Sequence, residues 1–193
     1  GHPAALTPFL STNTAPTAEA FVVREHPIRV RGRAGGRLAP APRTWFAGSV
    51  EATNILFHGS RLETVSAQIS YTNDVLTLDP LFLERPEGEA RGRLALDFAR
   101  DTVSVTATST VHPNALARMV GPITEAWVGS GRWEGPVRLE ADGVLDMGGS
   151  GRHDLRFRLE GEDIGFRWFT ASNAEAEGVL RGRTLTLAPV RAT

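Results

Sequence analysis

The stretch V-S-A-Q-I-S-Y-T-N-D-V-L-T-L-D-P-L, residues 65–81, decides the fold of this chain. Apolar and polar residues alternate on both sides of Asn73-Asp74, and these two residue types tolerate the left-handed backbone of a tight turn. A period of two places alternate side chains on opposite faces of a strand. The stretch therefore predicts a β-hairpin with one apolar and one polar face.

The same alternation recurs along most of the chain, for example over 94–98 and 157–159. Residues typical of turns separate the runs, at 86–88, 100–101, 142–143, 148–151 and 181–183. We predict a mainly β fold, a repetitive antiparallel meander of about ten strands with short helical insertions. The meander is expected to fold into an elongated curved sheet or groove. A closed β-sandwich is the alternative, because the apolar face must be covered in one way or another.

The opening stretch has a second copy 109 residues downstream. Laying residues 45–81 over 154–190 without gaps gives eight identities in 37 positions, whereas unrelated segments would give about two. Asn54 and Asp163 differ in identity but keep their chemical type. Self-similarity at a fixed period is the signature of a repeat array.

The repeat extends upstream to two similar His-Pro motifs, which begin at His2 and His112. In the second copy, apolar residues follow at helical spacing: Leu116, Val120, Ile123 and Trp127. We predict a first β-repeat unit over residues 1–110 and a second, truncated unit over 111–193, each opened by a short helical segment. Because the second copy stops early, the natural protein is expected to continue beyond Thr193.

The composition argues against several classes of protein. All 21 basic residues are Arg, and 22 acidic residues balance them, so no basic surface for nucleic acid is expected. The sequence has no Cys, which removes disulfides, thiolate metal sites and Cys nucleophiles. No stretch approaches the ~20 apolar residues of a membrane span, and no secretory signal is visible.

Candidates for catalysis are few. The five His have no metal-ligand spacing, and the G-x-S-x-G motif of serine hydrolases is absent. Glu160 and Asp163 could serve acid–base chemistry, but they have counterparts in Glu51 and Asn54, which favours a structural role. His112 is interpreted as a residue that begins a helix. We predict no enzymatic activity, no metal and no cofactor.

Four segments carry a family resemblance: F-A-G-S-V-E-A-T-N-I-L-F-H-G (46–59), the opening stretch, G-E-A-R-G-R-L-A-L-D (88–97) and W-E-G-P-V-R-L-E-A-D-G (133–143). In this order they resemble the AsmA-like bacterial envelope proteins, which include the TamB-like proteins. The resemblance implies a long sheet folded along its length into a groove with an apolar floor. It also implies a protein that is anchored in the inner membrane, crosses the periplasm and takes part in moving phospholipid to the outer membrane.

We therefore predict a non-enzymatic segment of an envelope bridge, which supports phospholipid transport between the two membranes or outer-membrane assembly. Its partners would be phospholipid acyl chains and unidentified envelope proteins, with membrane contact through regions outside this sequence. The alternative is a structural or adhesive β-repeat scaffold with a closed core and no lipid path. The candidate lipid-groove residues are Ile55, Phe57, Ile69, Tyr71, Leu76, Leu78, Leu94, Leu96, Phe98, Val103, Val105, Phe157, Leu159, Ile164, Phe166, Leu185 and Leu187.

Overall fold

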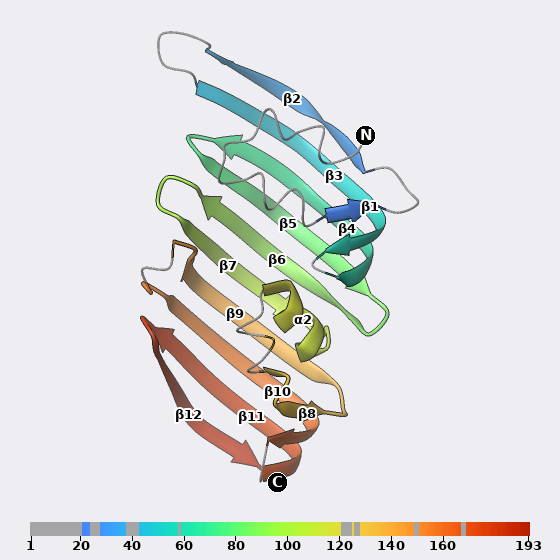
Figure 1. Ribbon diagram of the computed structural model, residues 1–193, viewed down its shortest axis with the longest axis vertical. Coiled ribbons are helices and arrows are strands. Elements are labelled where there is room, and N and C mark those ends of the chain that lie inside the picture. The colour runs from blue at the N-terminus through green and yellow to red at the C-terminus, as the bar shows by residue number, and fades with distance from the viewer. Residues whose placement is uncertain are drawn as a thin grey trace.

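The computed structural model describes residues 21–23, 28–37, 43–57, 59–120, 125, 128–148, 151–166 and 169–193. Within them, the chain forms one 12-stranded antiparallel sheet, with helix α2 (Pro113–Val120) between β7 and β8 (Figure 1). The strands are β1 (Phe21–Val23), β2 (Arg29–Arg37), β3 (Arg43–Phe57), β4 (Ser60–Thr72), β5 (Val75–Arg85), β6 (Gly88–Asp97), β7 (Thr102–Ser109), β8 (Gly131–Trp133), β9 (Val137–Asp146), β10 (Asp154–Phe166), β11 (Phe169–Arg181) and β12 (Thr184–Ala192).

The strands lie in the sheet almost in the order in which the chain visits them. From β3 to β12, neighbours in sequence are neighbours in space, except that β7 pairs directly with β9. Strand β2 flanks β3 at one end of the sheet and β12 lies at the other end, so these two strands do not meet in the described part of the chain (Figure 1). The predicted meander is confirmed, and the sheet is open rather than closed into a sandwich.

Strands β1 and β8 are short additions that the sequence did not reveal. Each has three residues and pairs with the far end of a long strand. Val23 of β1 lies opposite Ile55, and Trp133 of β8 lies opposite Ile164. Three residues are too few to display a period of two, so such strands are recognisable only from their tertiary pairing.

The turn predicted at Asn73-Asp74 is confirmed, with φ angles of 49° and 61°. The turn predicted at Asp142-Gly143 is wrong, because β9 runs through both residues. Gly143 has a φ of 148° and pairs with Val105 on one side and Leu155 on the other. This backbone conformation is open to little besides glycine. Here the glycine maintains a continuous strand and does not end one.

Strands β2 to β5 recur as β9 to β12. Strands β4 and β11 both have 13 residues and begin 109 positions apart. The cross-strand pair Arg29–Glu51 recurs as Arg138–Glu160. The pairing of β7 with β9 joins the two copies into one sheet. The opening helical segment predicted for the first copy lies outside the described residues, so the unit boundary between residues 110 and 111 stays a prediction.

The strongest structural mark of the repeat is a bend in β3 and β10. Asn54 and Asp163 have φ angles of 51° and 48°, in the left-handed region. In a regular strand, residues 52 and 55 would point to opposite faces. Ala52 and Ile55 instead belong to one core cluster, because the left-handed residue between them redirects the chain. Ile55 and its counterpart Ile164 are 2% and 7% exposed.

The buried core is thin. The structure describes eleven buried hydrophobic residues, and six of them are alanines: Ala52, Ala67, Ala90, Ala115, Ala117 and Ala171. A closed two-layer core is filled with large side chains at crystal-like density. The described residues therefore form one main layer, with a core only where α2 and the bent strand ends meet the sheet.

His112 begins helix α2, as interpreted from the sequence. Its carbonyl oxygen accepts hydrogen bonds from the backbone N–H groups of Ala115 (2.9 Å) and Leu116 (3.2 Å). Its ring Nδ1 accepts the backbone N–H of Asn114 at 3.3 Å. The other ring nitrogen lies 3.1 Å from the carbonyl oxygen of Trp133, which connects the helix to β8.

Replacing His112 with Ala should lower the free energy of unfolding by about 1 kcal/mol, the usual cost of a lost N-cap. Denaturant unfolding followed by circular dichroism measures this loss. His112→Asn is the matched control, because an Asn side chain also accepts a backbone N–H at this position and should recover most of the stability. Equal stability of the Ala variant and the native chain would contradict the capping role.

Candidate functional site

The register of the sheet assigns each paired residue to one of two faces. Residues directly opposite each other on neighbouring strands point to the same face. Ile69 on β4 lies opposite Leu78 on β5, and Leu78 lies opposite Leu94 on β6. The row continues through Val105 on β7. Following such pairs from β2 to β12 separates the side chains into an apolar and a polar face.

The apolar face consists of four rows that cross the strands. Each of the two central rows runs from β3 to β12. The first consists of Gly48, Ile69, Leu78, Leu94, Val105, Gly143, Leu155, Leu180 and Leu185. The second consists of Val50, Ala67, Leu81, Gly92, Ala107, Ala141, Phe157, Gly178 and Leu187. The outer rows contain Ala52, Val65, Leu83, Ala90, Ser109, Leu139, Leu159 and Ala176 on one side and Phe46, Tyr71, Leu76, Leu96, Val103 and Leu145 on the other.

Tyr71 is one of the two polar residues in these rows, and its hydroxyl reaches the turn at the end of its strand. It donates a hydrogen bond of 2.9 Å to Asp74 in the β4–β5 turn. Burial, and then the adjacent Asp74 carboxylate, raise the pKa of Tyr71. The phenol therefore stays neutral, and its ring extends the apolar surface while its hydroxyl reaches a polar partner.

The structure brings together twelve of the seventeen candidate groove residues. Their positions on the apolar face follow from the register: Ile69, Tyr71, Leu76, Leu78, Leu94, Leu96, Val103, Val105, Phe157, Leu159, Leu185 and Leu187. Ile55, Phe57 and Ile164 lie instead at the bent strand ends, and Ile55 and Phe57 share a cluster there. Phe98 follows the end of β6 and is half-buried. The side chain of Phe166 lies outside the described residues.

The sequence prediction missed Leu81 and Leu83, although both belong to the apolar face. A β-bulge at Asp79-Pro80 places two residues opposite the single Gln68 and shifts the phase of alternation. Leu155 and Leu180 were also missed, although Leu155 precedes Phe157 and Leu159 at a period of two. That periodicity could have revealed Leu155.

Among the described elements, only α2 and the bent strand ends with β1 and β8 lie over the apolar face (Figure 1). Leu116 and Met119 of α2 pack against core clusters that contain Ala90 and Leu62. Toward the sheet ends, Val30 and Leu187 are each 51% exposed. Val30 is exposed because it lies on an edge strand that no described element covers.

The dimensions of the apolar face follow from the sheet geometry. Ten strands from β2 to β12 at about 4.8 Å spacing span roughly 43 Å. Four rows, two residues apart at about 3.4 Å per residue, span roughly 20 Å along the strands. An acyl chain in a bilayer leaflet occupies about half of the ~30 Å hydrocarbon core. One chain therefore fits within the width of the face.

The polar face carries charges of alternating sign. Ion pairs link Arg91 with Glu89 (3.0 Å) and Arg138 with Glu140 (2.9 Å), and Thr106 donates a hydrogen bond of 2.8 Å to Asp142. These groups are exposed, so each ion pair contributes no more than about 1 kcal/mol. Their main effect is to keep this face in water.

Arg158 on the polar face pairs with two carboxylates. Its guanidinium lies 2.6 Å from Glu175 and 2.9 Å from Glu160. The carboxylates of Glu175 and then Glu160 raise the pKa of Arg158, which stays charged. Glu160, considered above for acid–base chemistry, is therefore a partner in a structural ion pair.

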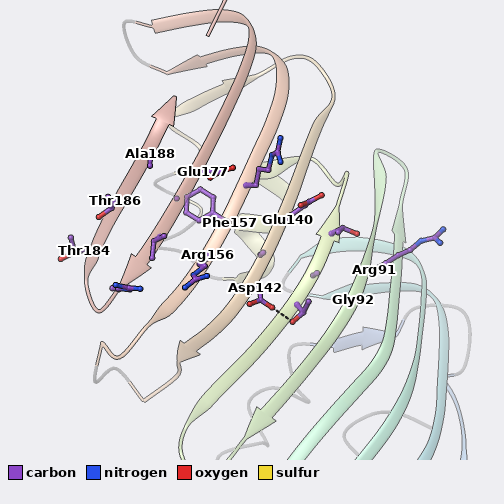
Figure 2. A pocket seen from close by; sticks show the side chains of 18 residues that line it. Arg91, Gly92, Glu140, Asp142, Arg156, Phe157, Glu177, Thr184, Thr186 and Ala188 are labelled. Atoms are coloured by element: carbon purple, nitrogen blue, oxygen red, sulfur yellow. Dashed lines mark hydrogen bonds between the residues drawn. The ribbon is translucent and has the colours of Figure 1, made fainter. Parts of the chain in front are cut away.

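A hollow of about 1000 Å³ lies on the polar face across β6 to β12. Figure 2 shows Arg156, Glu177, Thr184 and Thr186 around it, on strands β10 to β12. Arg91 and Thr106 of the first copy also line it, and so do small or apolar residues such as Gly92, Ala107 and Phe157. The sequence did not predict this hollow. Among the described residues, no group of three or more His, Asp or Glu is placed to hold a metal ion.

Comparisons with protein families, with curated proteins and with solved structures found no match to this chain. In the part of the chain that the structure describes, no helix has both the length and the apolar character needed to cross a membrane.

Proposed function

We propose that this chain is a non-enzymatic β-repeat segment whose apolar face shelters phospholipid acyl chains. The observation that carries the proposal is the continuity of the apolar rows across the junction of the two copies. Val105 of the first copy lies opposite Gly143 of the second, and Leu155 follows in the same row. Ala107 and Ala141 face each other in the other central row, so a ligand that moves along the central rows meets no polar side chain at the junction.

The energetics favour acyl chains as the occupant. A contiguous apolar surface of this size is usually covered by a partner, a membrane or a ligand. Each buried methylene contributes about 0.8 kcal/mol, so ten methylenes contribute roughly 8 kcal/mol without any placed polar group. A surface that depends on area alone suits a ligand that slides, because no single position binds much more tightly than the next.

The resemblance of residues 46–59, 65–81, 88–97 and 133–143 to AsmA-like proteins supports the same proposal from the sequence. It suggests a place in the periplasm, with inner-membrane attachment through regions outside this sequence. In that setting the segment would form part of a bridge along which phospholipid moves between inner and outer membranes. The polar face, with its alternating charges, would then face the aqueous periplasm.

Photo-crosslinking tests this function. A photoreactive amino acid is placed on the apolar face, at Ile69, Leu78, Leu96 or Leu187, and the protein is exposed to phospholipid vesicles. The controls are the sequence neighbours on the polar face: Ser70, Thr77, Ala95 and Thr186. We expect at least about ten-fold more lipid adduct from the apolar positions, equivalent to about 1.4 kcal/mol of preference. Equal or absent capture at both sets would favour a scaffold without a lipid path.

A further inference from the structure

The outer edge of β12 has a counterpart inside the sheet. β12 is the repeat equivalent of β5, and β5 pairs on its far side with β6. In that pairing Leu76 lies opposite Leu96, and Leu78 lies opposite Leu94. In the described part of the chain, β12 pairs with β11 alone. The structure therefore contains both an open edge and the strand that completes the equivalent edge.

The side chains of β12 show the effect of the open edge. Leu185 and Leu187 are the equivalents of Leu76 and Leu78, and they are 36% and 51% exposed. Leu76 and Leu78 are half-buried between neighbours on both sides. In β5, strand β6 covers the side that is open in β12.

The first half of the β12 edge also lacks the features that usually protect a sheet end. Natural edge strands carry charges, prolines or bulges that prevent pairing with another chain. The first five residues of β12, Thr184 to Ala188, contain no charge, and T-L-T-L has high β-propensity. The bulge and Pro189 come only after them. The backbone N–H and C=O groups of this run can therefore donate hydrogen bonds to an added strand and accept them from it.

We propose that the outer edge of β12 is a docking site for an antiparallel strand with the side-chain pattern of β6. The occupant is a segment of the type G-R-L-A-L, with Leu at the positions opposite Leu185 and Leu187 and a small residue between them. One leucine would extend the central row that ends at Leu185, and the other would extend the central row that ends at Leu187. This proposal rests on the repeat register and is independent of lipid binding.

The test uses a labelled synthetic peptide of residues 88–97 and the full 193-residue chain. We expect saturable one-to-one binding by fluorescence anisotropy, together with slower amide exchange at 184–188 and no change at 29–37. Two further peptides carry N-methyl groups on alternate amides. In an added strand, every second backbone N–H points toward the edge, and the others point away from it. The peptide that is methylated on the amides facing β12 should therefore bind at least ten-fold more weakly. The peptide that is methylated on the other amides should bind like the unmethylated peptide.

Matched chain variants complete the experiment. Leu187→Asp should weaken peptide binding at least ten-fold, because it removes an apolar contact, whereas Thr186→Asp on the opposite face should change it less than three-fold. Three results would each overturn the proposal: no binding at millimolar peptide, equal effects of the two N-methylated peptides, or exchange protection away from β12. Lipid capture is measured on the same samples, so that a failure of strand docking can be distinguished from a failure of the proposed lipid-binding function.

Discussion

A glutamate in place of Leu94 is expected to reduce phospholipid capture by this chain at least ten-fold. Leu94 lies in a central row of the apolar face, between Leu78 and Val105. The change removes a side chain whose burial contributes about 1.5–3 kcal/mol. It also brings a carboxylate against acyl chains, where an unpaired charge is strongly disfavoured. Mass spectrometry of lipid that co-purifies with the chain measures the loss.

Ala95→Glu is the matched control. Ala95 is the next residue along β6, but it lies opposite Thr77 and Ser104 on the polar face. Both variants add one negative charge to the same strand, and only one of them places it on the apolar face. The amount of phospholipid captured by the Ala95→Glu variant should therefore stay close to that of the native chain. Undiminished capture by a folded Leu94→Glu chain would contradict the proposed function.

The sequence predicted the two faces of the sheet because they depend on a local property. A period of two assigns residues to faces without knowledge of the partner strand, so Ile69, Leu78 and Leu94 could be grouped before any pairing was known. The prediction failed where the period breaks. The bulge at Asp79-Pro80 shifted the phase and hid Leu81 and Leu83.

Other features depend on contacts between distant segments, and the sequence could not reveal them. The hollow on the polar face collects Arg91 from the first copy and Ala188 from the second. Its lining comes from strands β6 to β12, so no single strand encodes it. The sequence also could not reveal that the sheet is open, because alternation alone is equally compatible with a closed sandwich.

The bend of β3 and β10 gives the match between Asn54 and Asp163 a physical explanation. The sequence showed only that the two residues keep their chemical type. The structure shows that both are in the left-handed region, which Asn, Asp and Gly tolerate better than other residues. The repeat therefore preserves a backbone requirement, and an acid–base role for Asp163 is unnecessary to explain it.

Replacing both Asn54 and Asp163 with Val should lower the free energy of unfolding by about 2–4 kcal/mol. A side chain in the left-handed region costs about 1–2 kcal/mol per residue, and a β-branched residue is among the least tolerated there. The two sites are six strand spacings apart, roughly 29 Å, so their effects should add. Denaturant unfolding of the two single variants and the double variant measures both the size and the additivity.

Glycine at the same two positions separates backbone strain from the loss of side-chain contacts. Asn54→Gly and Asp163→Gly remove the side chains but keep the left-handed conformation available at no steric cost. Their stability should remain within about 1 kcal/mol of the native chain. If the Gly and Val variants lost equal stability, the side-chain contacts would be the cause, and the backbone requirement inferred from the two φ angles would be wrong. If the Val variants alone lost stability, the bend that turns Ile55 and Ile164 toward the apolar side would be the structural feature that the repeat maintains.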